Sequence, residues 1–187
     1  TVGGQTRYAG ELFLTQPGLQ LPREADQYLK ISLTIAGFGE KSGKSDFPCS
    51  LRCFLLPEPL PKFIEPYNAP SGFCLLLEYR NQAEPVHISL LQKTPGVSGF
   101  GNLLYAGSIA CADLPLRIDL CLNAETYRLN FSREVDTDQG ARSGWQQLGR
   151  TDFGQAQLRF GARLVNHATG GQATVRFAAL RIIQPVP

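Results

Sequence analysis

Residues 28–36 read Tyr-Leu-Lys-Ile-Ser-Leu-Thr-Ile-Ala, and this stretch decides the fold class. Its side chains alternate strictly in polarity, with Leu29, Ile31, Leu33 and Ile35 set against Lys30, Ser32 and Thr34. Successive side chains of a β-strand point to opposite faces, so a period of two gives one apolar face and one polar face. We therefore predict a half-buried β-strand here.

The same period recurs along the chain. Further strands are predicted at residues 73–80, 86–92, 116–123, 127–132, 157–164 and 173–183. In the last of these, Val175, Phe177 and Ala179 form the expected apolar face. No helical spacing extends beyond about two turns, and half-buried strands stack their apolar faces against each other. We predict an all-β chain that folds as a two-sheet antiparallel β-sandwich.

Prolines and glycines mark the loops. Residues 57–70 hold five prolines, each lacking the N–H that a central strand donates, and residues 37–46 are predicted to form a second loop. Neither loop is a break in composition, so residues 1–187 are predicted to form a single β-sandwich domain. Because the chain has no Met and begins at Thr1, we expect it to be excised from a longer or processed product.

Composition excludes two classes of function. The chain has 18 basic and 16 acidic residues, a net charge of +2 that is too balanced for a nucleic-acid binder relying on bulk electrostatics. No run of residues approaches the ~18 apolar side chains that a membrane span needs, so none is predicted. With 43% hydrophobic residues, the chain has enough apolar material for a core.

The five cysteines are an odd number, so at least one thiol is free if the others pair. They are Cys49, Cys53, Cys74, Cys111 and Cys121. Free cysteines are among the most buried residues, which favours small core side chains here, and a disulfide is the alternative. This pattern is compatible with both an oxidising and a reducing compartment.

The order of segments in the C-terminal third resembles a known superfamily. A strand at 116–120 is followed by a tyrosine strand at 126–131, the turn Ser143-Gly144-Trp145, a Gly-x-Arg strand at 160–163 and a closing strand at 173–182. Over residues 110–183 this order is similar to the closing half of concanavalin A-like (laminin G-like) jelly-roll domains. The resemblance implies a jelly roll in which the phenylalanine of the closing strand, here Phe177, is buried.

That superfamily includes glucanases, lectins, carbohydrate-binding modules and adhesion domains. Its glucanases carry a Glu-x-Asp-x-x-Glu strand, whereas the candidate segment here, Glu134-Val135-Asp136, lacks the third acid. Asp136, Asp138 and Gln139 are loop oxygens that would suit a structural calcium ion, the one cofactor we consider. We assign no catalytic residue and no metal ligand.

Arginine dominates the polar faces of the predicted strands. After residue 115 there are nine Arg and no Lys, and planar guanidinium groups suit carboxylates, sulfates and sugar hydroxyls. Our candidate ligand-binding residues are Glu78, Arg80, Arg117, Asp119, Arg128, Asn130, Trp145, Arg159 and Arg163. The alternative is a set of cross-strand ion pairs on a solvated sheet face, with Trp145 packed beside the Gly144 turn.

These observations favour a non-catalytic carbohydrate-binding or accessory module of a larger extracellular or cell-surface protein. Its expected partners are a carbohydrate on the concave sheet face and neighbouring domains of the same chain. One alternative is a glycan-active hydrolase of the same fold that uses Glu78 or Asp119, which would need a second carboxylate about 5–10 Å away. Another is a purely structural or protein-interaction domain that contacts its partner through residues 57–70.

Overall fold

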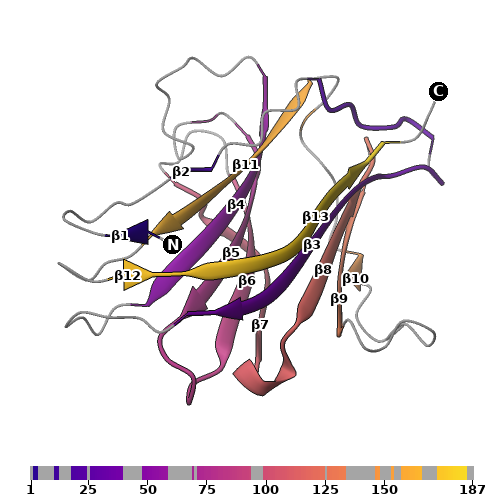
Figure 1. The fold of residues 1–187 in the computed structure, drawn as a ribbon. Coiled ribbons are helices and arrows are strands. Elements are labelled where there is room, and N and C mark those ends of the chain that lie inside the picture. The colour runs from indigo at the N-terminus through magenta and orange to yellow at the C-terminus, as the bar shows by residue number, and fades with distance from the viewer. Residues whose placement is uncertain are drawn as a thin grey trace.

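Two antiparallel β-sheets lie face to face in the computed structural model of the chain (Figure 1). The structure describes residues 2–3, 11–12, 18–24, 26–39, 48–58, 69, 71–93, 99–124, 126–133, 146–147, 153, 157–165 and 172–184. Within these ranges the one helical segment is a 3₁₀ turn at Cys111–Asp113. The predicted all-β fold and the pair of antiparallel sheets are confirmed.

The first sheet has five strands, in the order β10, β9, β8, β3 and β13. Their bounds are Gln146–Gln147 for β10, Tyr127–Arg133 for β9, Leu116–Leu122 for β8, Leu29–Phe38 for β3 and Val175–Ile183 for β13. The strand that opens with the alternating stretch, β3, is therefore central and pairs with β8 on one side and β13 on the other.

The second sheet has six strands, in the order β2, β11, β4, β5, β6 and β7. Their bounds are Glu11–Leu12 for β2, Leu158–Val165 for β11, Cys49–Pro57 for β4, Phe73–Tyr79 for β5, Val86–Gln92 for β6 and Asn102–Ile109 for β7. A separate small pair joins β1 (Val2–Gly3) to β12 (Gln172–Ala173).

The core lies between the two sheets and is built from the inward side chain of every second residue. The alternating leucines and isoleucines of β3 are at most 4% exposed and share one apolar cluster with inward residues of β4, β5, β6, β8 and β11. Phe73 of β5 is 1% exposed, and its ring lies 4.7 Å from the ring of Tyr127 and 5.3 Å from that of Phe153. These rings join the two sheets.

Two long strands, β4 and β7, escaped the sequence prediction, as did the two-residue strands β1, β2 and β10. In β4 the apolar run Phe54-Leu55-Leu56 is buried on both faces, so no polar residue marks the period. β7 lies at the edge of its sheet with a mixed burial pattern, so alternation is weak there too.

The loop predictions were partly wrong. The loop expected at 37–46 starts later than predicted, since Gly37 and Phe38 belong to β3. In the loop at 57–70, Pro57 ends β4, and most of the remainder falls outside the described residues.

Phe177 is 41% exposed, so its predicted burial was wrong. The pairing of β13 with β3 shifts register between Arg176 and Phe177 and again between Phe177 and Ala179. Each shift is a bulge, and a bulge changes which face the following residues use. Leu180 and Ile182 pack against the core instead.

We expect Phe73→Ala to lower the free energy of unfolding by about 3–5 kcal/mol, because it removes the ring that contacts Tyr127 and Phe153 and leaves a cavity. Urea denaturation followed by circular dichroism measures this change. Leu103→Ala is the matched control, since Leu103 is 56% exposed and its loss is expected to cost no more than about 0.5 kcal/mol. Equal losses for the two variants would contradict this account of the core.

Candidate functional site

Polar side chains of three neighbouring strands meet on the outward face of the five-stranded sheet. The register places Ser32 of β3 opposite Asp119 of β8, and Asp119 opposite Asn130 of β9. One step along, Lys30 lies opposite Cys121, and Cys121 lies opposite Arg128. The same alternation that builds the core therefore gathers these polar groups on the other side of the sheet.

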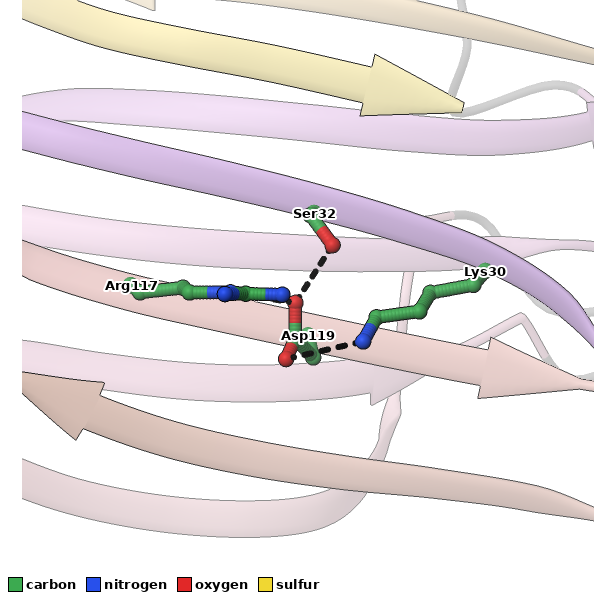
Figure 2. Close-up of polar contacts among 4 residues, drawn as sticks. All are labelled: Lys30, Ser32, Arg117 and Asp119. Atoms are coloured by element: carbon green, nitrogen blue, oxygen red, sulfur yellow. Dashed lines mark hydrogen bonds and ion pairs between the residues drawn. The ribbon is translucent and has the colours of Figure 1, made fainter. Parts of the chain in front are cut away.

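Asp119 is the centre of this group, and Figure 2 shows three donors converging on its carboxylate. Ser32 Oγ donates to Oδ1 at 2.5 Å, Arg117 Nε donates to the same oxygen at 3.0 Å, and Lys30 Nζ lies 3.3 Å from Oδ2. The Asp119 side chain is 6% exposed, whereas those of Lys30 and Arg117 are 30% and 43% exposed. We call Lys30, Ser32, Arg117 and Asp119 the Asp119 cluster.

Burial of a carboxylate is costly unless cations and hydrogen-bond donors compensate it. The Asp119 cluster supplies both, and it holds the two cationic side chains at the surface of the sheet. Arg128 lies two residues from Asn130 on β9, so three cations and one carboxylate share this part of the face and its local charge is positive. The guanidinium carbon of Arg128 also lies 5.0 Å from the centre of the Tyr28 ring, a cation–π arrangement.

Asn130 carries a buried polar atom that its surroundings leave unsatisfied. The residue is 9% exposed, and its Oδ1 accepts no hydrogen bond in the part of the chain that the structure describes. Buried polar atoms are nearly always hydrogen-bonded in proteins, so an exception at a polar cluster is a feature of interest. Asn130 lies directly opposite Asp119 in the strand pairing.

The structure separates the other candidate residues from this cluster. Glu78 and Arg163 lie on the outward face of the six-stranded sheet, since their strand neighbours Leu77, Tyr79 and Ala162 belong to the core. The candidates that we expected on one concave face therefore occupy two opposite faces. The prediction assigned the polar sides of all strands to one sheet face, although the two sheets each have an outward face.

Arg159 and Arg80 each have an acidic partner. Arg159 Nε donates to Glu58 Oε1 at 2.7 Å, and Arg80 Nη1 lies 3.8 Å from Glu84 Oε2 just beyond the end of β5. Arg163 is 8% exposed, although the sequence placed it on a solvated face. The Arg159–Glu58 pair joins β11 to the residue that follows β4, as the alternative of cross-strand ion pairs expected, whereas the Arg80–Glu84 pair lies within the β5–β6 turn.

Three sequence predictions fall outside the described residues. These are Trp145, the Glu134-Val135-Asp136 segment and the proposed calcium ligands Asp136, Asp138 and Gln139. In the part that is described, no three His, Cys, Asp or Glu side chains gather as metal ligands would. The described ranges likewise contain no helix that is long and apolar enough to cross a bilayer.

The outward face of the six-stranded sheet also carries an apolar cluster that the sequence reading missed. Its buried members are Phe54, Leu56, Ala69 and Cys74, with Leu76, Leu91 and Phe100 packed against them. The signal was present in the uninterrupted apolar runs of β4 and β5, which indicate strands covered on both faces. The side chains of this cluster are therefore buried against one another and are not part of a polar binding face.

All five cysteines are free thiols, and four of them are buried. Burial raises the pKa of Cys74 to about 12 and that of Cys121 to about 11, and it raises the pKa of Cys53 as well. These thiols are protonated at neutral pH and act as small apolar side chains, as the sequence favoured. Cys111 is the one cysteine that is partly exposed, and its partial desolvation also raises the pKa of its thiol.

Comparison with known proteins identifies no family for this chain. No protein-family model matches the sequence, and no curated protein matches it. A crystal structure described as that of a functionally unknown protein from Saccharomyces cerevisiae aligns with 100% of this chain and 93% of its own length. Its sequence identity is 10% and its TM-score is 0.46, values too low to support an argument.

We expect Asp119→Ala to lower the free energy of unfolding by about 1.5–3 kcal/mol, the range for hydrogen bonds to charged groups. The substitution leaves the Ser32 hydroxyl buried without its acceptor and leaves Lys30 and Arg117 facing each other without the carboxylate. Urea denaturation measures the change, and Arg80→Gln is the control because its ion pair is exposed and worth little. A loss below about 0.5 kcal/mol for Asp119→Ala would mean that the cluster does not stabilise the sheet.

We expect a small maleimide to modify one thiol per native chain, at Cys111, and five per unfolded chain. Because its pKa is raised, the rate at Cys111 should be low at neutral pH and rise as the pH increases. Thiol counting by mass spectrometry measures both numbers. Cys111→Ser should remove the native reaction and leave four thiols in urea, and rapid modification of a second native thiol would refute the assignment.

Proposed function

We propose that this chain is a non-catalytic carbohydrate-binding module, and that its binding site is the outward face of the five-stranded sheet around the Asp119 cluster. The observation that carries the proposal is the buried, unpartnered Oδ1 of Asn130 opposite a carboxylate ringed by cations. A sugar hydroxyl both donates and accepts hydrogen bonds. It can accept from the exposed ends of Lys30 or Arg117, and it can donate to Asn130 Oδ1 once the Asn130 side chain turns outward.

The positive local charge narrows the class of carbohydrate. Lys30, Arg117 and Arg128 outnumber the carboxylate of Asp119 by two charges, and guanidinium groups bind carboxylates and sulfates in a bidentate manner. Tyr28, under Arg128, adds an aromatic side chain at the edge of the same face. The ligand we propose is therefore an acidic glycan, which carries uronate or sulfate groups. Such glycans suit the extracellular or cell-surface setting that we propose with it.

The fold we propose for this module is a concanavalin A-like jelly roll. Two pairings support it, because β13 returns to β3 in one sheet and β11 returns to β4 in the other. Strands distant in sequence are thus nested in pairs, one pair in each sheet, as rolling a long hairpin into a sandwich produces. The binding proposal needs no cofactor, and a calcium ion at Asp136 and Asp138 would be structural.

A glycan hydrolase of the same fold is less well supported. Glu78 and Asp119, the two candidate acids, lie on opposite outward faces of the sandwich, so they do not form a catalytic pair with each other. Among the described strand residues, the positions next to Asp119 in the register are Ser32 and Asn130, neither of which is a carboxylate. Two-carboxylate hydrolysis needs two acids that flank one scissile bond, at a separation of about 5–10 Å.

A glycan array that contains sulfated, uronate-bearing and neutral glycans tests the proposal. We expect acidic glycans to be retained, with binding that weakens as salt is raised because exposed charges are screened. In titration calorimetry with a retained glycan, Arg117→Gln and Asn130→Ala should each weaken binding by about tenfold. Arg80→Gln removes a guanidinium that is at least as exposed, 55% against 43% for Arg117, from outside this face and should leave the affinity unchanged.

Two outcomes would overturn the proposal. If no glycan binds, the purely structural or protein-interaction role remains, with neighbouring domains as partners. If a glycan binds and Arg80→Gln weakens it as much as Arg117→Gln does, the five-stranded face is not the site. Circular dichroism of each variant ensures that a lost fold is not read as lost binding.

A further inference from the structure

A pocket of about 420 Å³ lies at one end of the sandwich, away from the Asp119 cluster. The short helical turn after β7, drawn at the lower edge of the molecule in Figure 1, contributes Cys111 and Ala112 to its lining. Four separate segments of chain line it, and the lining side chains include Phe38, Tyr79, Gln82, Cys111, Leu114 and Arg176. Its volume falls within the range of small-molecule sites.

An aromatic pair forms the apolar wall of the pocket. The rings of Phe38 and Tyr79 stack with their centres 4.8 Å apart and their planes at 13°. Both residues are buried, at 6% and 2% exposure, and they come from different sheets, β3 and β5. Leu114 and the backbone around Cys111 complete this wall. A ligand body that contacts it must be apolar.

One cation, Arg176 of β13, also lines the pocket. Arg176 pairs with Gly37 in the strand register, and a Cβ at position 37 would lie 2.9 Å from its Nη2. The guanidinium group therefore occupies the space that the absent side chain of Gly37 leaves. Among the described residues that line the pocket there is no carboxylate, and no described residue forms an ion pair with Arg176.

The wall formed by the β5–β6 turn is held in place before any ligand binds. Asn81 Oδ1 accepts hydrogen bonds from the backbone N–H groups of Ala83 and Glu84 at 2.9 and 3.0 Å. The Cys111 thiol contacts the same turn, with Sγ 3.4 Å from the carbonyl oxygen of Glu84. Preorganisation of this kind lowers the entropic cost of binding.

We propose that this pocket binds a small organic monocarboxylate with an apolar body, its carboxylate on Arg176 and its body against Phe38 and Tyr79. A planar guanidinium that has no carboxylate partner among the described residues is suited to receive one from a ligand. The site is separate from the proposed glycan face and shares no residue with it. Failure of either proposal therefore leaves the other standing.

Titration calorimetry with benzoate, phenylacetate and hexanoate tests the proposal, each compared with its neutral amide and with acetate. The amides keep the apolar body without the charge, and acetate keeps the charge without the body. At least one of the three carboxylates should bind with one molecule per chain and about tenfold more tightly than its amide and than acetate. If none does so, the proposal is wrong.

Substitutions at Arg176 and Gly37 test whether the carboxylate binds in this pocket. Arg176→Gln should weaken binding of that carboxylate by about tenfold, and Arg181→Gln, an exposed arginine on the same strand outside the pocket, should leave it unchanged. Gly37→Ala keeps every charge but puts a methyl group 2.9 Å from Nη2, so the guanidinium must shift and binding should also weaken. Equal effects of Arg176→Gln and Arg181→Gln would show general charge attraction and overturn the proposal.

Cys111 gives an independent readout because it lines the pocket and is the one cysteine that is not buried. A bound carboxylate should slow its alkylation by maleimide several-fold, and the matching amide at the same concentration should not. The variant Arg176→Gln should lose this protection. Unchanged alkylation at a carboxylate concentration that saturates the calorimetric signal would place the ligand elsewhere and refute the assignment.

Discussion

The packing of one apolar face from each sheet against the other is the interaction on which the rest of the structure depends. Neither sheet can bury its leucines and isoleucines alone, so the two sheets stabilise each other through one continuous core. The ring of Phe73 contacts those of Tyr127 and Phe153 within it. Because side chains alternate, each inward residue places its neighbour outward. The positions of the polar residues therefore follow from the core.

This constraint explains which parts of the fold the sequence could predict. Residues 86–92 alternate cleanly, and β6 has those bounds. Alternation failed in β4, where both faces are covered, and in β13, where register shifts moved Phe177 to the surface. In both places the burial of the side chains departs from the two-residue period, because it depends on contacts that form only when the sheets assemble. The local sequence pattern predicts a strand best where one face of the strand is buried and the other is exposed to solvent.

The candidate site was predicted in part for a related reason. Alternation shows that Asp119 and Glu78 both point away from the core, but it does not show to which sheet each strand belongs. Arg117, Asp119, Arg128 and Asn130 came together because β8 and β9 are consecutive and pair as neighbours. Lys30, Ser32 and the Arg176 pocket depend on contacts between distant segments, which no local pattern contains. The Asp119 cluster and the pocket are thus products of topology.

The register shifts of β13 have a further consequence for how the molecule meets others of its kind. β13 ends the five-stranded sheet, and an edge strand offers unpaired backbone groups that can recruit a strand from another chain. A regular edge would be a template for such growth. The shifts beside Phe177 interrupt the ladder with which an incoming strand would have to match. The irregularity that defeats prediction from sequence thereby also protects the sheet from edge-to-edge aggregation.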